Sequence, residues 1–321
     1  MQLLHGDCLS IIPTLKTNSV DLIVTDPPYY RVKQDAWDNQ WKTEADFLAW
    51  CDQVLAELQR VLKPSGSLYW FAGPYMAAKL ELLVGERFDV LNHIVWVKNA
   101  GRHKVARKEG LTKYFPQTER IIFAEQKEQG SKVESAGARK AEHVYQPIVN
   151  RLNKQRLAAG LTVKECVELC GVSTASHYFT TSQFALPSEA NYVKLMDAFG
   201  AQGDYHKVKR SHRQLRTQYN KLKRAYRDAR RPFTVTKEVP YTDVWHFDVV
   251  QHYPGKHPCE KPQALLEHII NTSSKPGQVV LDAFMGSGST GKACLALDRR
   301  FVGIEKDKIL HRHFAEYVRG G

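Results

Sequence analysis

Five consecutive residues, Thr25-Asp-Pro-Pro-Tyr29, place a carboxylate, two prolines and an aromatic ring directly after an apolar run. Each proline fixes its own backbone φ angle and biases the residue before it away from helix, so this corner is rigid and extended. Asp26 and a prolyl carbonyl can accept the two hydrogens of an exocyclic amino group, while Tyr29 stacks on the ring that carries the group. Taken alone, the same residues favour a simpler interpretation, a turn that ends a strand beside a core tyrosine.

A glycine-rich segment near the C-terminus, Phe284-Met-Gly-Ser-Gly-Ser-Thr-Gly-Lys292, can hold a ligand by close approach of its backbone. Its spacing satisfies G-x-G-x-x-G and comes close to G-x-x-x-x-G-K-[ST]. Ala293 stands where the second pattern needs the hydroxyl that binds Mg²⁺, which argues against a phosphate loop. The first pattern, with Glu305 at the end of the next strand to bind a ribose, favours an adenosine-bearing ligand. A plain strand-to-helix turn remains the alternative.

The elements that must position these residues alternate between strands and helices. Short apolar runs that end at turn residues predict strands at 21–25, 67–72, 93–97, 120–125, 278–284 and 300–305. Thr43 and Asp46 form a helix start signal, and helices are predicted at 44–62, 289–297 and 308–318. Strands joined through helices indicate an α/β fold, in which ligands bind at the carboxyl ends of the strands.

The middle of the chain differs, because it contains no convincing strand. A helical segment ends at Gly160, Thr162 and Glu165 form a capping box that opens the next helix, and Ser173 can cap a further short helix. Ser188 opens another helix. The predicted domains are an α/β domain and a helical domain inserted into it, at 1–142 with 233–321 and at 143–232 respectively.

The inserted domain ends in a strongly basic helix at 205–231, which has eleven Lys or Arg residues against the single acid Asp228. One side of this helix is apolar, with a stripe formed by Leu215, Tyr219, Leu222 and Tyr226. The whole chain of 321 residues carries a net charge of +12, which favours a polyanionic partner, nucleic acid above all. We expect the basic helix to neutralise phosphates; a solvated charged face is the alternative.

Several classes of protein are disfavoured by composition. No apolar run approaches the roughly 20 residues that span a bilayer. The N-terminus lacks the basic and apolar regions of a secretion signal, so we expect a cytoplasmic protein. The six cysteines contain no C-x-x-C pair, so we predict reduced thiols and no metal site.

Four motifs occur together in a characteristic order: Gly6-Asp-Cys8, Asp26-Pro-Pro-Tyr29, His257-Pro-Cys-Glu-Lys-Pro262 and Asp282-Ala-Phe-Met-Gly-Ser-Gly288. In this combination the sequence resembles the β-type amino-group DNA methyltransferases, which use S-adenosylmethionine. The resemblance covers roughly residues 1–125 and 233–321. Ala283 replaces a proline that the family often has, which puts only the stiffness of the loop entry in doubt.

The resemblance implies a Rossmann-like methyltransferase sheet and a role for each motif residue. The implied catalytic residues are Asp26, Pro27, Pro28 and Tyr29. Glu305 would hold the ribose hydroxyls of the cofactor, Asp7 would approach its adenine, and Lys261 would meet its methionine carboxylate. The full implied cofactor site contains Asp7, Cys8, Asp26, Lys261, Asp282, Phe284, Gly286, Ser287, Gly288 and Glu305. The implied reaction methylates the N6 amino group of an adenine flipped out of double-stranded DNA.

The inserted domain would recognise the target sequence. Residues 161–173 resemble the helix-turn-helix of Cro-like repressors, and 187–200 resemble a later helix of that domain. The predicted DNA contacts are Tyr30, Lys207, Lys209, Arg210, Arg213 and Arg216. The resemblance also implies a homodimer and a possible partner restriction nuclease. The alternatives left open are a cytosine-N4 or RNA methyltransferase, and a DNA-binding regulator whose methyltransferase domain is inactive.

Overall fold

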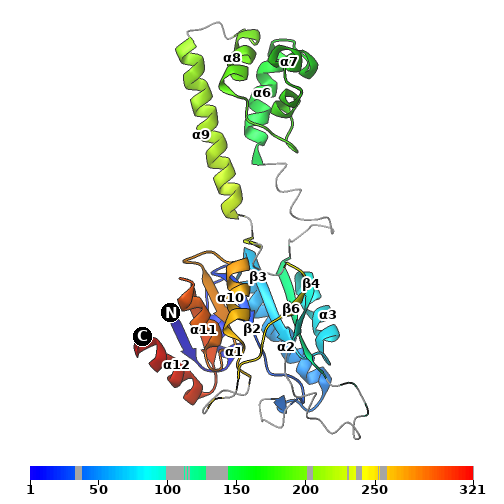
Figure 1. Cartoon of the computed structure of the whole chain (residues 1–321), viewed down its shortest axis with the longest axis vertical. Coiled ribbons are helices and arrows are strands. Elements are labelled where there is room, and N and C mark those ends of the chain that lie inside the picture. Colours follow the sequence, from blue (N-terminus) through cyan, green and yellow to red (C-terminus); the bar gives the residue numbers. More distant parts are fainter. Residues whose placement is uncertain are drawn as a thin grey trace. The chain divides into compact units, whose positions relative to one another are not determined.

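The computed structural model describes the chain except residues 33–37, 99–111, 113, 115, 128–143, 201–204, 230, 236–240, 252, 254–258 and 321, and the side chains of 205–210 and 225–229. The chain divides into two compact units (Figure 1). Unit 1 contains Met1–Gln129 and Arg231–Gly321, and unit 2 contains Gly130–Arg230.

Unit 1 is built on a twisted sheet. Within the described residues its strands are β1 (Gln2–His5), β2 (Val20–Thr25), β3 (Leu62–Ala72), β4 (Phe88–Val97), β5 (Thr118–Gln126), β6 (Val244–His246), β7 (Val279–Asp282) and β8 (Arg300–Glu305). They lie in the order β1-β8-β7-β2-β3-β5-β4-β6. All neighbouring pairs are parallel except those that β5 makes with β3 and β4.

The antiparallel direction of β5 decides which residues meet at the ligand-binding edge of the sheet. The parallel strands β2, β7 and β8 all end there, at Thr25, Asp282 and Glu305. Because β5 runs the other way, its first residues lie at that same edge, and Glu119 pairs with Trp96 near the end of β4. Residues from both ends of strands therefore converge on one place.

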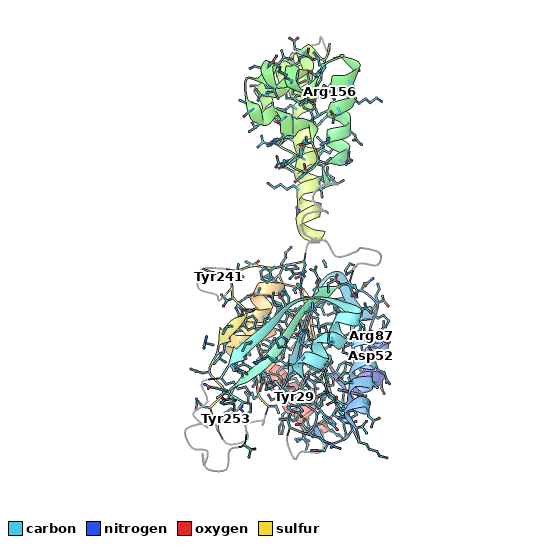
Figure 2. All side chains as sticks on the ribbon, turned by 90° about the vertical axis from the view of Figure 1, so that its right-hand side faces the viewer. Tyr29, Asp52, Arg87, Arg156, Tyr241 and Tyr253 are labelled. Carbon is cyan, nitrogen blue, oxygen red and sulfur yellow. The ribbon has the colours of Figure 1, made fainter. Side chains whose placement is uncertain are left out.

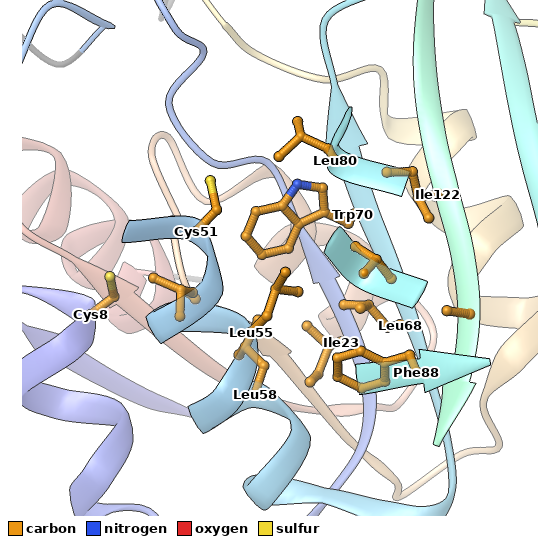
Figure 3. Close-up of a cluster of buried hydrophobic side chains, with 14 of the residues drawn as sticks. Cys8, Ile23, Cys51, Leu55, Leu58, Leu68, Trp70, Leu80, Phe88 and Ile122 are labelled. Carbon is orange, nitrogen blue, oxygen red and sulfur yellow. The ribbon is translucent and has the colours of Figure 1, made fainter. Parts of the chain in front are cut away.

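Helices cover both faces of the sheet, as Figure 1 shows for unit 1. One buried cluster joins the sheet to α1 (Cys8–Ile11), α2 (Glu44–Val61) and α3 (Ala77–Arg87). A second cluster joins the opposite face to α10 (Gln263–Ser273), α11 (Ser289–Ala296) and α12 (Lys308–Gly320). Strand β3 alternates between them: Leu68 and Trp70 lie in the first cluster, and Tyr69 and Phe71 in the second. Figure 3 shows Trp70 within the first cluster.

The predicted α/β fold is confirmed, and the local start signals are found where they were expected. Thr43 and Asp46 form a complete capping box at the start of α2. The six predicted strands are all present, with the β7 strand shorter than predicted. The short strands β1 and β6 were not predicted. They lie at the two edges of the sheet, where each pairs with one neighbour and carries a weaker apolar pattern.

Unit 2 contains helices and no strand among its described residues. Its elements are α6 (Gln146–Ala158), α7 (Val163–Cys170), the 3₁₀ helix η4 (Ser173–Phe179), α8 (Glu189–Ala198) and α9 (Tyr205–Ala229). Leu215 of α9 is buried in the core of this unit, and Tyr219 and Leu222 pack against it, as the apolar stripe predicted. The side chain of Tyr226 lies outside the described residues.

One helix of unit 2 differs from the prediction. The predicted short helix is present as the 3₁₀ helix η4, but Ser173 is its first residue rather than its cap, and Val172 before it makes no side-chain cap. Ala175 and Tyr178 are both buried, and the three-residue spacing between them matches one 3₁₀ turn. The 3₁₀ geometry therefore directs both of these side chains into the core of unit 2. Among the described residues of the whole chain, no helix combines the length and apolar composition needed to cross a membrane.

Candidate active site

A cavity of about 1500 Å³ opens at the edge of the sheet where β2, β7 and β8 end. It lies in unit 1, where Figure 2 labels Tyr29. Most of the predicted site residues line it, namely Asp7, Cys8, Asp26, Pro27, Pro28, Tyr29, Lys261, Asp282, Phe284, Gly286, Ser287 and Glu305. Asp26-Pro-Pro-Tyr29 and the glycine loop, far apart in sequence, thus share one cavity.

Buried hydrogen bonds tie the two motifs together. Thr25 Oγ1 donates to Asp282 Oδ1 (3.1 Å) and accepts from the backbone N–H of Ala283 (3.2 Å). Asp282 Oδ2 accepts from Thr290 Oγ1 (2.7 Å), and Phe284 N donates to Asp282 Oδ1 (3.1 Å). Burial raises the pKa of Asp282 to about 6, against the lowering effect of these hydrogen bonds. The Asp282 carboxyl thus fixes the entry of the glycine loop.

The glycine loop is a turn that other residues cannot readily form. Gly286 and Gly288 have positive φ angles of 54° and 80°. A Cβ added to Gly288 would lie 2.1 Å from the Phe314 ring, so this position also excludes any side chain by packing. Gly288, which the resemblance implied for the cofactor site, does not line the cavity, in contrast to Gly286 and Ser287.

Glu305 is held at the mouth of this loop by two backbone donors. Gly286 N donates to Glu305 Oε2 and Asp307 N donates to Glu305 Oε1, both at 2.7 Å. Each carboxylate oxygen keeps further acceptor capacity, and the residue lines the cavity. This geometry suits a carboxylate that binds a pair of hydroxyls. Asp7, at the N-cap of α1, also lines the cavity and forms an ion pair with Lys306 (3.0 Å).

Asp26 is the most distinctive group of the cavity. Its Oδ2 forms an ion pair with Lys261. Its Oδ1 is buried and has no hydrogen-bond partner among the described residues. Burial raises the pKa of Asp26, with Lys261 opposing this effect and Glu119 adding to it. A buried carboxylate oxygen without a donor is costly, so this atom is a strong candidate to accept hydrogens from a ligand.

Tyr29 is fixed by three neighbours. Its backbone N–H donates to Asp38 Oδ1 (2.9 Å), and its hydroxyl donates to Glu119 Oε2 (3.4 Å). A Cβ on Gly73 would lie 3.2 Å from the Tyr29 ring, so the ring occupies space that this glycine leaves open. These contacts hold the aromatic ring at the wall of the cavity.

Sequence reasoning missed Glu119 and Lys98. Both line the cavity, and Lys98 forms an ion pair with Glu119 Oε1. Glu119 directly precedes the predicted strand at 120–125, and Lys98 directly follows the one at 93–97. The sequence does show that each is an ionisable residue at the end of an apolar strand. Only the antiparallel pairing of β5 with β4 shows that the start of β5 lies beside the end of β4.

A family model described as a DNA methylase matches residues 20–316 of the chain. The chain belongs to this DNA methylase family. The predicted family and a methyltransferase activity on DNA are therefore confirmed.

Individual relatives of this DNA methylase cover nearly its whole length. It is 28% identical to the DNA adenine methyltransferase YhdJ of Escherichia coli K12, over 99% of this chain and 80% of that protein. A protein from Thermus thermophilus, described as a DNA modification methylase and solved with S-adenosyl-L-methionine, is 20% identical, with a TM-score of 0.51 and coverage of 100% and 97%. The cytosine-N4-specific PvuII DNA methyltransferase has a TM-score of 0.52 at 13% identity, with coverage of 97% and 83%. The fold is thus shared with a methyltransferase specific for cytosine N4.

The remaining predicted residues of the DNA methylase have varied surroundings. Cys8 is buried, and burial raises the pKa of its thiol to about 12, so it stays protonated. Tyr30 packs against Phe47 in the core, with 5.6 Å between ring centroids. Arg213 and Arg216 are exposed on α9. The side chains of Lys207, Lys209 and Arg210, and residues His257 and Pro258, lie outside the described residues.

Proposed function

We propose that this DNA methylase transfers a methyl group from S-adenosyl-L-methionine to the N6 amino group of adenine in double-stranded DNA. The observation that carries the proposal is the buried Asp26 Oδ1, which has no donor among the described residues and belongs to a residue that lines the cavity shared with the glycine loop. An amino group fits this atom because it has hydrogens to donate.

The cavity residues in and near the glycine loop fit the cofactor. Gly286 turns with φ at 54° and lets the backbone approach a ligand closely, and Glu305 keeps acceptor capacity for ribose hydroxyls. S-adenosyl-L-methionine supplies an electrophilic methyl group on a positively charged sulfur. Asp7, Phe284 and Ser287 complete this side of the cavity. The expected contact of Lys261 with the methionine carboxylate stays a prediction, because the Lys261 ammonium forms ion pairs with Asp26 and Glu119.

The part of the cavity lined by Asp26 and Pro27 would activate the amino group that accepts the methyl group. The lone pair of an adenine amino nitrogen is delocalised into the ring, which makes the nitrogen a poor nucleophile. Asp26 Oδ1 and the Pro27 carbonyl would accept its two hydrogens and favour a more tetrahedral nitrogen with an available lone pair. Positioning and fixed charges then supply most of the rate enhancement.

The target base must leave the DNA stack to reach this cavity, at a cost of a few kcal/mol. Stacking on Tyr29 would offset about 1–3 kcal/mol of this cost. Because hydrogen bonds to Asp38 and Glu119 hold Tyr29, its ring is already positioned for stacking before the base binds.

The target-recognition domain in this proposal is the predicted insert at 143–232, most of which lies in unit 2 (Gly130–Arg230). Support comes from its helix-turn-helix-like segment and from the exposed Arg213 and Arg216 on the basic helix α9. A homodimer and a partner restriction nuclease are further expectations from the family resemblance alone. Analytical ultracentrifugation tests the first of them.

The choice of adenine rests on Asp26-Pro-Pro-Tyr29, because cytosine-N4 enzymes typically have S-P-P-[YF] at this place. The test is modification-sensitive sequencing of DNA from cells that express the chain. We expect N6-methyladenine in one sequence motif, and none from cells that express Asp26→Ala. N4-methylcytosine in its place would support the alternative base, and unmodified DNA would support an inactive methyltransferase domain in a DNA-binding regulator.

A further inference from the structure

Two carboxylates and two ammonium groups form a connected set in the cavity. Lys261 forms ion pairs with Asp26 and with Glu119 Oε2 (3.5 Å), and Lys98 forms an ion pair with Glu119 Oε1. Tyr29 adds a hydroxyl that donates to Glu119 Oε2 (3.4 Å). Glu119 therefore contacts the lysine that holds Asp26 and also the tyrosine of the same motif.

This set is buried, so its charges interact strongly. The side chains of Lys261 and Glu119 are only 10% and 13% exposed. Burial acts to raise the pKa of Glu119, but Lys261 and Lys98 outweigh it and lower that pKa. Glu119 is thus held ionised, and its negative charge raises the pKa of Asp26 in turn.

The division of the Lys261 donors between two carboxylates has a chemical consequence. A lysine ammonium has three N–H donors and no acceptor. While Glu119 Oε2 attracts this ammonium, Asp26 gives it only Oδ2 and keeps Oδ1 without a partner among the described residues. Without Glu119, a second N–H donor of Lys261 would be free to turn towards Asp26 and compete for the oxygen that must accept the target amino hydrogens.

We propose that Glu119 is a positioning residue for methyl transfer, which holds Lys261 and Tyr29 so that Asp26 Oδ1 stays free for the target amino group. This inference rests on the proposed function, because it assigns Asp26 Oδ1 to that amino group. Glu119 acts through its neighbours and does not itself touch the reacting atoms.

The main test compares Glu119→Gln with Glu125→Gln. Glu125 is on the same strand β5 and also forms an ion pair, with Arg231 at 2.7 Å, but it does not line the cavity. We expect Glu119→Gln to lower kcat by about 10–100-fold with a smaller change in KM for DNA. We expect Glu125→Gln to leave kcat within about twofold of the original enzyme. Equal kcat values for both variants would overturn the positioning role.

A second readout needs neither cofactor nor DNA. The carboxyl group of Asp26 can be titrated by ¹³C NMR of the free protein, with its signal assigned by comparison with Asp26→Asn. Lys261, Glu119 and Tyr29 act on it directly; Lys98 acts on Glu119, Cys259 acts on Tyr29 and Lys261, and Asp282 is a further carboxyl group that Asp26 affects. We expect the pKa of Asp26 to fall in Glu119→Gln, which removes a negative neighbour, and to rise in Lys261→Met, which removes a positive one. An unmoved titration in Glu119→Gln would show a merely structural role.

Glu119→Asp keeps the test decisive if Glu119→Gln fails to fold. It retains the charge but withdraws the carboxylate by one methylene from Lys261 and Tyr29. We expect it to fold and to lose kcat, and full activity in a folded Glu119→Asp protein would contradict the positioning role. Undiminished methylation by Asp26→Ala would overturn the proposed function itself. An inactive Asp26→Ala protein beside a fully active Glu119→Gln protein would overturn only the role of Glu119.

Discussion

Thr25 Oγ1 donates a hydrogen bond to Asp282 Oδ1 at 3.1 Å, although 257 positions separate the two residues in the chain. Thr25 ends β2 directly before Asp26, and Asp282 ends β7 directly before the glycine loop. The bond therefore fixes the amino-binding corner relative to the proposed cofactor loop. Methyl transfer requires these two parts to be held in register, since misplacement by about 1 Å can cost 100-fold in rate.

Thr25→Val should destabilise this junction. The substitution keeps the shape of the side chain but leaves the N–H of Ala283 buried and without its acceptor. We expect a loss of about 1–3 kcal/mol in the free energy of unfolding, measured by urea denaturation. Thr25→Ser keeps the hydroxyl and should lose much less. If Thr25→Val is as stable as the unsubstituted protein, the junction does not depend on this bond.

Gly288→Ala should be more damaging than Gly277→Ala, although both glycines have φ near 80° (80° and 79°). The left-handed backbone costs an alanine about 1–2 kcal/mol at either position. At Gly277 no atom lies within 4 Å of the added Cβ, whereas at Gly288 the Phe314 ring lies 2.1 Å from it. We expect a total loss of about 2–5 kcal/mol for Gly288→Ala in thermal or urea unfolding. Equal losses for the two variants would show that Phe314 moves aside freely.

These glycines illustrate what the sequence could predict and what it could not. The G-x-G-x-x-G spacing predicts a turn, because the pattern is local. It does not show that Gly288 packs on Phe314 of α12, because that contact depends on how two distant helices lie on the sheet. The capping boxes at Thr43 and Thr162 were predictable for the same local reason, since each is complete within four residues.

The cluster of Asp26, Tyr29 and Glu119 in the cavity could be predicted only in part. Asp26 and Tyr29 belong to one short motif that is visible in the sequence. Glu119 reaches them only because β5 runs antiparallel to β3 and β4, and apolar periodicity does not indicate strand direction. The short helix near Ser173 was predicted, but neither its 3₁₀ geometry nor the place of Ser173 as its first residue rather than its cap was.

His268 should make the stability of the protein depend on pH. It packs against Trp245, with 4.6 Å between ring centroids, and burial lowers its pKa to about 4 from 6.5. The unfolded chain therefore binds more protons between these pH values, so the contribution of His268 is complete above pH 6.5 and is lost as the pH falls towards 4. His268→Phe should remove up to about 3 kcal/mol of this acid sensitivity in urea denaturation.

His268→Gln separates titration from packing. It should share the weaker pH dependence of His268→Phe while having a lower stability at neutral pH, because it buries an amide beside Trp245. If the pH dependence of both variants equals that of the unsubstituted protein, His268 is not the titrating group.

Arg213 and Arg216 should contribute to DNA binding through phosphates. Each contact that is removed should lower the dependence of log affinity on log salt concentration by about one. We expect Arg213→Ala with Arg216→Ala to lower this slope by about two in a fluorescence anisotropy titration. Arg312→Ala with Arg319→Ala changes the net charge equally on the exposed face of α12 and should leave the slope nearly unchanged. Equal slopes for the two double variants would mean that α9 faces solvent.

Asp26→Ala tests the central claim most directly, in a single-turnover assay of methyl transfer to DNA with cofactor binding measured in parallel. The account predicts that the rate falls by at least about 100-fold, because the acceptor of the target amino hydrogens is lost. Binding of S-adenosyl-L-methionine should survive at least in part, because the glycine loop and Glu305 do not depend on Asp26. Methyl transfer at an undiminished rate in this variant would contradict the proposed function.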